Sequence, residues 1–279
     1  MRKTIARAVT AEGVALHAGT PVRAELLPAP RDTGIVFRRD DQGVEIPARH
    51  DRVVETRLGT TIAGGGATIA VIEHLMAAVF AAGIDDLVIA LDGPEPPLLD
   101  GDAISWLDVI DSAGVRDQEG ERPAIKVMTR VEVEHGNASA ALSPADALAF
   151  DFAIQFDSAA IGAQQLSWTF SPAAFRRDIA PARTFGFVQE LAGLRAAGLA
   201  NGASLENTLS IEGDGLRNPG LQRFADEFVR HKILDAIGDL ALAGAPLIGR
   251  FEGRRSGHAL NNALLRALFA DPANYEMTR

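Results

Sequence analysis

His231, Asp235 and Asp239 follow one another at intervals of four residues in an otherwise apolar stretch, residues 224–244. The apolar positions of this stretch repeat with a helical rather than a strand period, and Gly244 is suited to end a helix. Residues four apart are neighbours on a helix surface. We therefore expect the imidazole and the first carboxylate to converge on one point as a pair of metal ligands, with the second carboxylate one turn further along.

A metal site on this helix needs a third ligand from elsewhere in the chain. Catalytic zinc takes three protein ligands and leaves a fourth position for water. Because the chain has no cysteine, histidine and carboxylate are the only donors available. The six histidines are His17, His50, His74, His135, His231 and His258. His74 is the best third ligand because it begins a second helical pattern, residues 71–82, and directly follows an acid, Glu73; sequence spacing alone does not show that it meets His231.

Four ordered motifs carry a resemblance to a known family. They are IEHLMAA at residues 72–78, ARTFGF at 182–187, HKILD at 231–235 and SGHALNN at 256–262. Together with KTIARAVTAEGVALHAG at 3–19 and LDGPEPPLLDG at 91–101, they cover nearly the whole chain. The sequence resembles the UDP-3-O-acyl-N-acetylglucosamine deacetylases.

This resemblance implies a reaction and a cofactor. The activity would be hydrolysis of the acetamide of UDP-3-O-(3-hydroxyacyl)-N-acetylglucosamine, with release of acetate, the committed step of lipid A biosynthesis. The cofactor would be one catalytic zinc ion, with iron(II) as an alternative, held by His74, His231 and Asp235. Bound zinc brings the pKa of its water towards about 7 and polarises a carbonyl.

The resemblance also implies the groups that move protons. Glu73 matches the general base, and His258 matches the acid that protonates the leaving amine. Asp239 would hold the His258 imidazolium charged. Taken alone, Glu73 is an acid in the first turn of a helix, His258 a hydrogen bonder at a helix start, and Asp239 a solvated or paired acid.

Two further residues match groups that stabilise the oxyanion. Thr184 resembles the hydroxyl donor, and Lys232 would meet the oxyanion or the phosphates of the substrate. Taken alone, Thr184 is structural and Lys232 a surface residue. Phe185 and Arg255 are candidates for contacts with the sugar and the diphosphate. Residues 187–205 could line a groove for the acyl chain or form an amphipathic core helix.

Composition excludes several classes of function. The chain has 279 residues, 47% of them hydrophobic, which is enough for two domains or one large one. A net charge of −10 argues against a nucleic-acid partner, which would require a basic patch. No apolar run is long enough to cross a bilayer, and the N-terminal residues lack a hydrophobic signal core. We therefore expect a cytoplasmic protein without a nucleic-acid partner, and the resemblance implies a small-molecule substrate, an acylated UDP-sugar.

The order of expected elements suggests an internal repeat. Strand patterns fill residues 2–62, followed by a helix, a strand at 86–91 and a helix near 104–114. The charged stretch 115–124 is the best linker, and the same order of elements follows it. We predict an α+β protein of two similar two-layer α/β sandwich domains, packed together with the active site at their interface. The predicted domains are residues 1–120 and 121–279.

Smaller features limit the alternatives. AGGGA at 63–67 is typical of a hairpin turn rather than a phosphate cradle, because no Lys-Ser/Thr follows it. A zinc peptidase is disfavoured because HExxH is absent. A non-catalytic paralogue that binds acyl-sugar nucleotides is disfavoured because all the catalytic residue types are present. FDSAAIG at 156–162 lacks the His-Pro pair common in the family, which leaves room for a deacetylase of a related acylated sugar nucleotide.

Overall fold

The computed structural model describes residues 1–278, and its two largest sheets have the same strand order. Each contains five strands, and the last of the five in sequence lies in the centre, antiparallel to the second and parallel to the third. The first sheet runs β2 (Val9–Val14), β3 (Pro21–Pro28), β9 (Leu87–Leu91), β4 (Ile35–Arg39), β5 (Val44–Pro47). The second runs β12 (Val131–His135), β13 (Ala138–Ser143), β20 (Arg250–Arg254), β14 (Ala149–Gln155), β15 (Ala163–Thr169). The prediction of two similar α+β units is confirmed.

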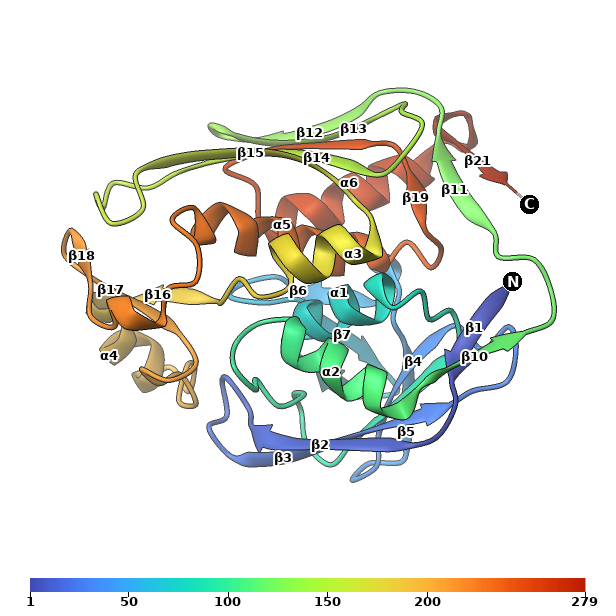
Figure 1. The fold of residues 1–279 in the computed structure, drawn as a ribbon, viewed down its shortest axis with the longest axis horizontal. Helices are drawn as coiled ribbons and strands as arrows, with labels where there is room; N and C mark the ends of the chain where they lie inside the picture. Colours follow the sequence, from blue (N-terminus) through green and yellow to red (C-terminus); the bar gives the residue numbers. More distant parts are fainter. Residues whose placement is uncertain (279) are drawn as a thin grey trace.

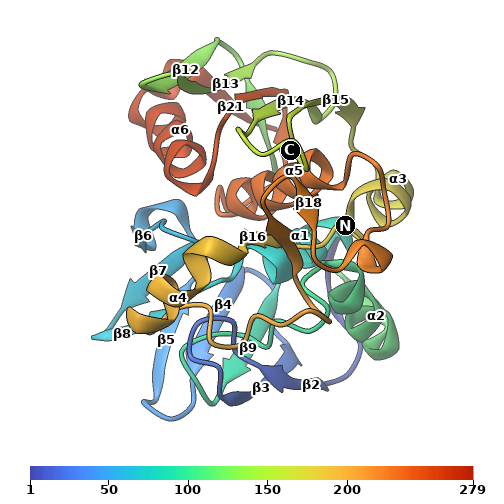
Figure 2. The same cartoon turned by 90° about the vertical axis from the view of Figure 1, so that its left-hand side faces the viewer.

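The helices lie between the two sheets, which form the outer layers of the molecule (Figures 1 and 2). They are α1 (Glu73–Ala81), α2 (Ile104–Ala113), α5 (Glu227–Ala241) and α6 (His258–Ala270). Burial alternates along β3 and β14, because one face of each sheet packs on these helices. α1 and α5 pack against each other at the centre, and each precedes the central strand of its own sheet. The helices predicted at 71–82 and 224–244 are confirmed, with shorter ends.

Gly238 allows α1 and α5 to approach closely. A Cβ atom at this position would lie 2.0 Å from the backbone carbonyl oxygen of Glu73. No side chain fits in that space, so only glycine permits the contact. The approach brings the first turn of α1, which contains Glu73 and His74, against the middle of α5.

Each unit has an insertion before its central helix, and the two insertions differ. The first consists of η1 (His50–Arg52), β6 (Val53–Glu55), β7 (Thr61–Gly64) and β8 (Ala67–Ile69). The second consists of α3 (Pro172–Ala174), a π-helical turn (Phe175–Ile179), β16 (Phe185–Phe187), α4 (Val188–Ala196), β17 (Leu209–Glu212), β18 (Gly215–Leu216) and η3 (Pro219–Leu221). Gly65 and Gly66 have positive φ angles between β7 and β8, which confirms the predicted hairpin turn. The β16–β18 region lies at the left of Figure 1, beyond the end of the helix layers.

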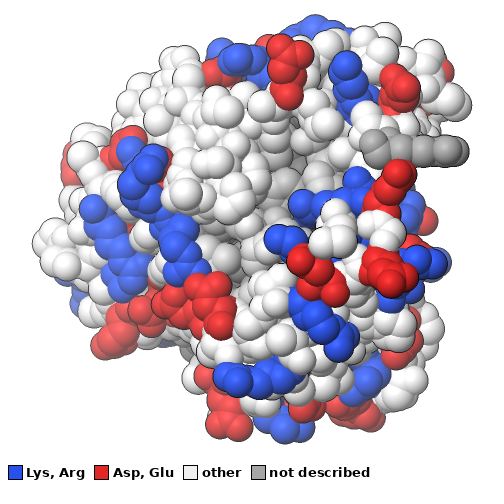
Figure 3. Space-filling model, turned by 45° about the vertical axis from the view of Figure 1, so that its right-hand side comes forward, with Lys and Arg blue, Asp and Glu red and all other residues white. Residues whose placement is uncertain are grey.

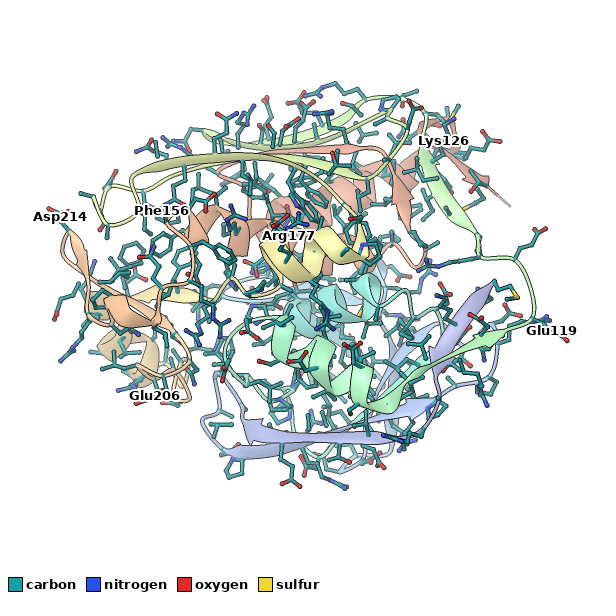
Figure 4. The ribbon with its side chains drawn as sticks, in the orientation of Figure 1. Glu119, Lys126, Phe156, Arg177, Glu206 and Asp214 are labelled. Carbon is teal, nitrogen blue, oxygen red and sulfur yellow. The ribbon has the colours of Figure 1, made fainter. Side chains whose placement is uncertain are left out.

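In each unit, short strands outside the five-stranded sheet pair the beginning of the unit with its end. β1 (Arg2–Ile5) pairs with β10 (Val115–Gln118), whereas β11 (Ala124–Val127) pairs with β19 (Leu247–Ile248) and with β21 (Tyr275–Thr278), which follows η4 (Pro272–Asn274). Glu119 lies in the crossing segment between these pairings, at the right of Figure 4. The boundary at residue 120 falls in this segment and remains a prediction.

Charged side chains of both signs are interspersed on the face of the molecule drawn in Figure 3. On the face in Figure 3, Lys and Arg side chains alternate with Asp and Glu rather than forming one basic stripe. This agrees with the net charge of −10. Within residues 1–278, no helix combines the length and apolar character needed to cross a membrane.

Candidate active site

His74, His231 and Asp235 converge where α1 meets α5. All three are buried, and one ligand atom from each lies within 4.8 Å of the other two. Asp235 Oδ1 is 3.5 Å from His74 Nε2 and 3.4 Å from His231 Nε2. His74 comes from the first turn of α1, whereas His231 and Asp235 are one turn apart on α5. The structure therefore places the expected third ligand beside the pair on the longer helix.

The main chain orients the ring of His231. Its Nδ1 lies 3.1 Å from the carbonyl oxygen of Ala182, which can only accept a hydrogen bond. Nδ1 therefore carries the proton, and the lone pair of Nε2 faces Asp235. Burial lowers the pKa of His231 to about 3, so the ring is neutral at pH 7. Neutral imidazole is the form that binds metal ions.

The two carboxylate oxygens of Asp235 have different surroundings. Oδ2 accepts a hydrogen bond from Lys232 Nζ at 2.7 Å, so Lys232 lies beside the candidate ligands rather than on the outer surface of α5. Oδ1 is buried and has no hydrogen-bond partner among the described residues. An unpaired buried carboxylate oxygen is costly. A divalent cation between Oδ1 and the two Nε2 atoms would remove that cost, and zinc accepts this set of donors.

Glu73 is buried next to the ligand cluster. Its Oε2 accepts a hydrogen bond from the backbone N–H of Thr60 at 2.9 Å. Its Oε1 faces His258 Nε2 at 3.9 Å. Burial raises the pKa of Glu73 above its ordinary value. One oxygen is thus held by the main chain while the other faces the site, as a proton acceptor requires.

His258 is the first residue of α6 and is paired with Asp239 of α5. Its Nδ1 is 2.9 Å from Asp239 Oδ2, which also accepts a hydrogen bond from Asn261 Nδ2 at 2.8 Å. Burial opposes a charge on His258, but Asp239 and Glu73 outweigh this effect and raise the pKa of His258 to about 9. The ring is therefore an imidazolium at pH 7 and can donate a proton from Nε2.

These groups line one cavity of about 290 Å³. Besides the three candidate ligands, its walls include Glu73, Thr184, Phe185, Lys232 and His258. Asp239 lies behind His258, through the hydrogen bond between them. Arg255 is not among the lining residues; it lines a separate cavity, next to Arg254.

An apolar cavity of about 370 Å³ adjoins the site. Its walls come from β16, α4 and β17, together with Leu16 and Leu58 from the first unit. Leu16, Leu58, Thr184 and Phe185 line both cavities, so the two adjoin. Phe156, labelled in Figure 4, packs on Phe185 with the ring centroids 5.7 Å apart. The stretch 187–205 thus forms a helix and a cavity wall.

Thr60 and Asn261 are site residues that the sequence did not reveal. Both donate hydrogen bonds to Asp239, Thr60 through its hydroxyl at 2.5 Å and Asn261 through its amide at 2.8 Å. Asn261 follows His258 by three residues, so the two share a helix face, and this spacing in the sequence could have indicated a role for Asn261. No pattern in the sequence indicates a role for Thr60, because its position depends on how the loop before β7 folds.

The two similar α+β units enclose a candidate metal centre with a buried carboxylate and a partly buried imidazolium beside it. This combination is typical of hydrolases that use a metal ion. Comparison with known sequences identifies the family within this class of hydrolases. The sequence model of the family described as UDP-3-O-acyl N-acetylglycosamine deacetylase matches residues 2–270. The chain belongs to this family.

Individual relatives agree with the family match. The chain is similar to proteins named UDP-3-O-acyl-N-acetylglucosamine deacetylase from three bacteria. The protein from Phenylobacterium zucineum (strain HLK1) is 48% identical over 264 residues, 93% of this chain and 90% of the relative. The protein from Nautilia profundicola is 46% identical over 272 residues, 98% of this chain and 93% of the relative. The protein from Anaeromyxobacter sp. (strain Fw109-5) is 44% identical over 278 residues, 100% of this chain and 91% of the relative.

Proposed function

We propose that the protein hydrolyses the acetamide of UDP-3-O-(3-hydroxyacyl)-N-acetylglucosamine and releases acetate, the committed step of lipid A biosynthesis. The observation that carries this proposal is the convergence of a His–His–Asp cluster with Glu73 and His258, in a chain of the deacetylase family. Because the substrate is a nucleotide sugar, the proposed site of action is the cytoplasm.

His74, His231 and Asp235 are the proposed ligands of one zinc ion, with iron(II) as the alternative. The unpaired Oδ1 of Asp235 and the neutral ring of His231 support this assignment. When bound, the ion would lower the pKa of a water molecule and polarise the acetamide carbonyl. Lys232 holds the other oxygen of Asp235, which leaves Oδ1 directed at the imidazoles.

Glu73 is the proposed general base. Oε1 takes a proton from the attacking water while Oε2 stays fixed by the N–H of Thr60. The raised pKa of Glu73 makes the carboxylate a stronger base, and burial keeps bulk water away from it. The new carbon–oxygen bond converts the planar amide carbon into a tetrahedral one, with negative charge on the former carbonyl oxygen.

His258 is the proposed general acid. As the carbon–nitrogen bond breaks, His258 Nε2 gives its proton to the leaving sugar nitrogen, so the products are acetate and a free amine. Asp239 keeps the ring protonated until that point, through the 2.9 Å contact at Nδ1. Glu73 Oε1 and His258 Nε2 lie 3.9 Å apart, which supports a base and an acid that act on the same amide group.

Thr184 and Lys232 are proposed to stabilise the oxyanion. Both line the cavity with the ligands. Lys232 donates one ammonium hydrogen to Asp235, and its remaining ammonium hydrogens can bind an oxyanion or a phosphate. The loss of one such donor costs about 3–4 kcal/mol in other hydrolases.

The adjoining apolar cavity is the proposed site for the acyl chain. Phe185 lies where the two cavities meet and is the proposed contact for the sugar. Arg255 remains a proposed diphosphate contact, although it lines a different cavity from the candidate ligands.

The test is turnover of UDP-3-O-(3-hydroxyacyl)-N-acetylglucosamine with a series of acyl-chain lengths by the zinc-loaded protein, with acetate and the free amine measured by mass spectrometry. We expect both products in equal amounts, and none from a His74→Ala control. Tight binding without turnover would instead indicate a non-catalytic paralogue. Faster turnover of another acylated sugar nucleotide would indicate a related substrate.

A further inference from the structure

Thr60 makes hydrogen bonds to two carboxylates on different helices. It is 2% exposed and ends the loop between β6 and β7. Its backbone N–H donates to Glu73 Oε2 on α1 at 2.9 Å, and its hydroxyl donates to Asp239 Oδ1 on α5 at 2.5 Å. One residue of the first insertion therefore holds the proposed base directly and the proposed acid through Asp239.

The hydroxyl of Thr60 completes the hydrogen bonding of Asp239. Oδ2 of this carboxylate accepts from His258 Nδ1 and Asn261 Nδ2, and Oδ1 accepts from Thr60. Asp239 is 2% exposed, so water cannot easily replace a lost donor. Without the Thr60 hydroxyl, the carboxylate would turn to satisfy Oδ1, and the ring of His258 would turn with it.

The backbone before Thr60 has an unusual conformation that delivers these contacts. Leu58 has φ +59° and Gly59 has φ +146°. A Cβ atom at Gly59 would lie 3.0 Å from Glu73 Oε1. Left-handed backbone is costly for a residue such as leucine and persists only where the surroundings enforce it. The loop thus bends tightly around the Glu73 carboxylate to bring in the N–H of Thr60.

We propose that Thr60 is a positioning residue that sets the spacing between the base Glu73 and the acid His258. This inference rests on the proposed function, because it assigns both ends of the spacing their chemical roles. Thr60 acts through Asp239 and Glu73 and does not line the cavity that would hold the substrate.

The first test removes the hydroxyl but keeps the shape of the side chain. In zinc-loaded Thr60→Val, we expect kcat to fall by about 10- to 100-fold, the scale of a misplaced catalytic group. KM and zinc content stay within about twofold of the wild type. Thr60→Ser restores the hydroxyl and recovers kcat to within about threefold. The matched control is Thr61→Val, the same substitution at the next residue.

The second test asks whether the effect passes through His258. If it does, Thr60→Val has no further effect on kcat in a His258→Ala background. An equal loss of kcat in both backgrounds overturns the inference. If Thr60→Val does not fold, Thr60→Ala gives the same comparison.

A third measurement does not depend on turnover. The His258 Nδ1–H proton, identified by its absence in His258→Ala, gives a downfield NMR signal that reports the hydrogen bond to Asp239. We expect this signal to move or broaden in Thr60→Val and to stay in place in Thr60→Ser and Thr61→Val. An unchanged signal, or a Thr60→Val kcat within threefold of the wild type, overturns the positioning role while the deacetylase activity stands. If the signal moves in Thr60→Val but the wild-type protein releases no acetate, the proposed function is overturned and the Thr60–Asp239–His258 coupling stands.

Discussion

The two α+β units share a strand order but contribute different chemistry to the site. α1 of the first unit provides Glu73 and His74 in adjacent positions, whereas α5 of the second provides His231, Asp235 and Asp239 along one stripe. Their insertions also differ, since β6–β8 positions Thr60 and β16–β18 with α4 encloses an apolar cavity. The common scaffold brings two helices together, and the side chains and insertions added to it determine the function.

The largest expected effect comes from removing a ligand from either unit. His74→Ala and His231→Ala each leave two of the three proposed ligands. Loss of a residue that merely hydrogen-bonds to a metal ligand typically lowers metal affinity by roughly 10- to 100-fold, and we expect a larger fall in zinc affinity here. Zinc per protein, measured by elemental analysis after dialysis, checks this. His135→Ala, at an exposed histidine of β12, is the control. A full equivalent of tightly held zinc in His74→Ala would show that the first unit supplies no ligand.

Neighbouring residues on α1 are expected to separate metal binding from proton transfer. Glu73→Gln keeps the shape of the side chain but cannot take a proton, so we expect kcat to fall by about 10²- to 10⁴-fold. Zinc content stays at one equivalent, in contrast to His74→Ala. Steady-state kinetics and metal analysis of the same preparation measure both quantities. Normal turnover would remove Glu73 from the mechanism.

The pH profile separates the base of the first unit from the acid of the second. The pKa of His258 is raised to about 9, so its proton is present below that pH and is lost as the pH rises through it. The pKa of Glu73 is raised above its ordinary 4.5, so the base is lost as the pH falls through a value above 4.5. We expect a bell-shaped plot of kcat/KM against pH, with the alkaline limb near 9. An alkaline limb that survives in His258→Gln must arise from another group.

Gly238 tests how closely the two units must approach. In Gly238→Ala, the new methyl group would collide with the Glu73 carbonyl, so we expect the free energy of unfolding to drop by about 1–3 kcal/mol and kcat to drop with it. Denaturant titration gives the stability change. The control is Gly193→Ala in α4, where no atom lies within 4 Å of the new Cβ and alanine favours the helix by roughly 0.5–1 kcal/mol.

The smallest effect is expected from a change in the segment that connects β10 of the first unit to β11 of the second. We propose that the domain boundary lies at residue 120, since the strand pairings on either side of it differ and Glu119 and Gly120 are exposed. Insertion of four Gly/Ser residues after Gly120 adds little loop-closure entropy and leaves the contact between α1 and α5 unchanged. We expect kcat and zinc content within about twofold of the wild type. Loss of zinc from this variant would mean that the crossing segment holds the units in register.

Much of the fold, and the convergence of the candidate ligands, could be predicted from sequence for a physical reason. The apolar positions of residues 224–244 predict a helix, and the four-residue spacing of His231 and Asp235 makes them neighbours on it. His74 could be chosen because it begins a second helical pattern and directly follows an acid, Glu73, in a chain whose only possible donors are histidine and carboxylate. The roles of Glu73, His258 and Asp239 came from the family resemblance and remain proposals.

Other contacts depend on three-dimensional details that a sequence pattern does not encode. Thr60 reaches Asp239 only because Leu58 and Gly59 adopt left-handed backbone conformations. The close contact at Gly238 depends on the crossing of two helices, although the glycine itself is visible in the sequence. The apolar cavity is built from short elements whose packing cannot be deduced from periodicity.

The strand order has a consequence for the synthesis of the protein. In both sheets the middle strand is the last to be made, β9 in the first and β20 in the second. Neither sheet can be completed until the helix before that strand has left the ribosome and found its place. The N-terminal unit can therefore close early, while the C-terminal unit keeps an open edge between β13 and β14 until almost the whole polypeptide has emerged. Such long-range pairing slows folding and leaves strand edges open to aggregation.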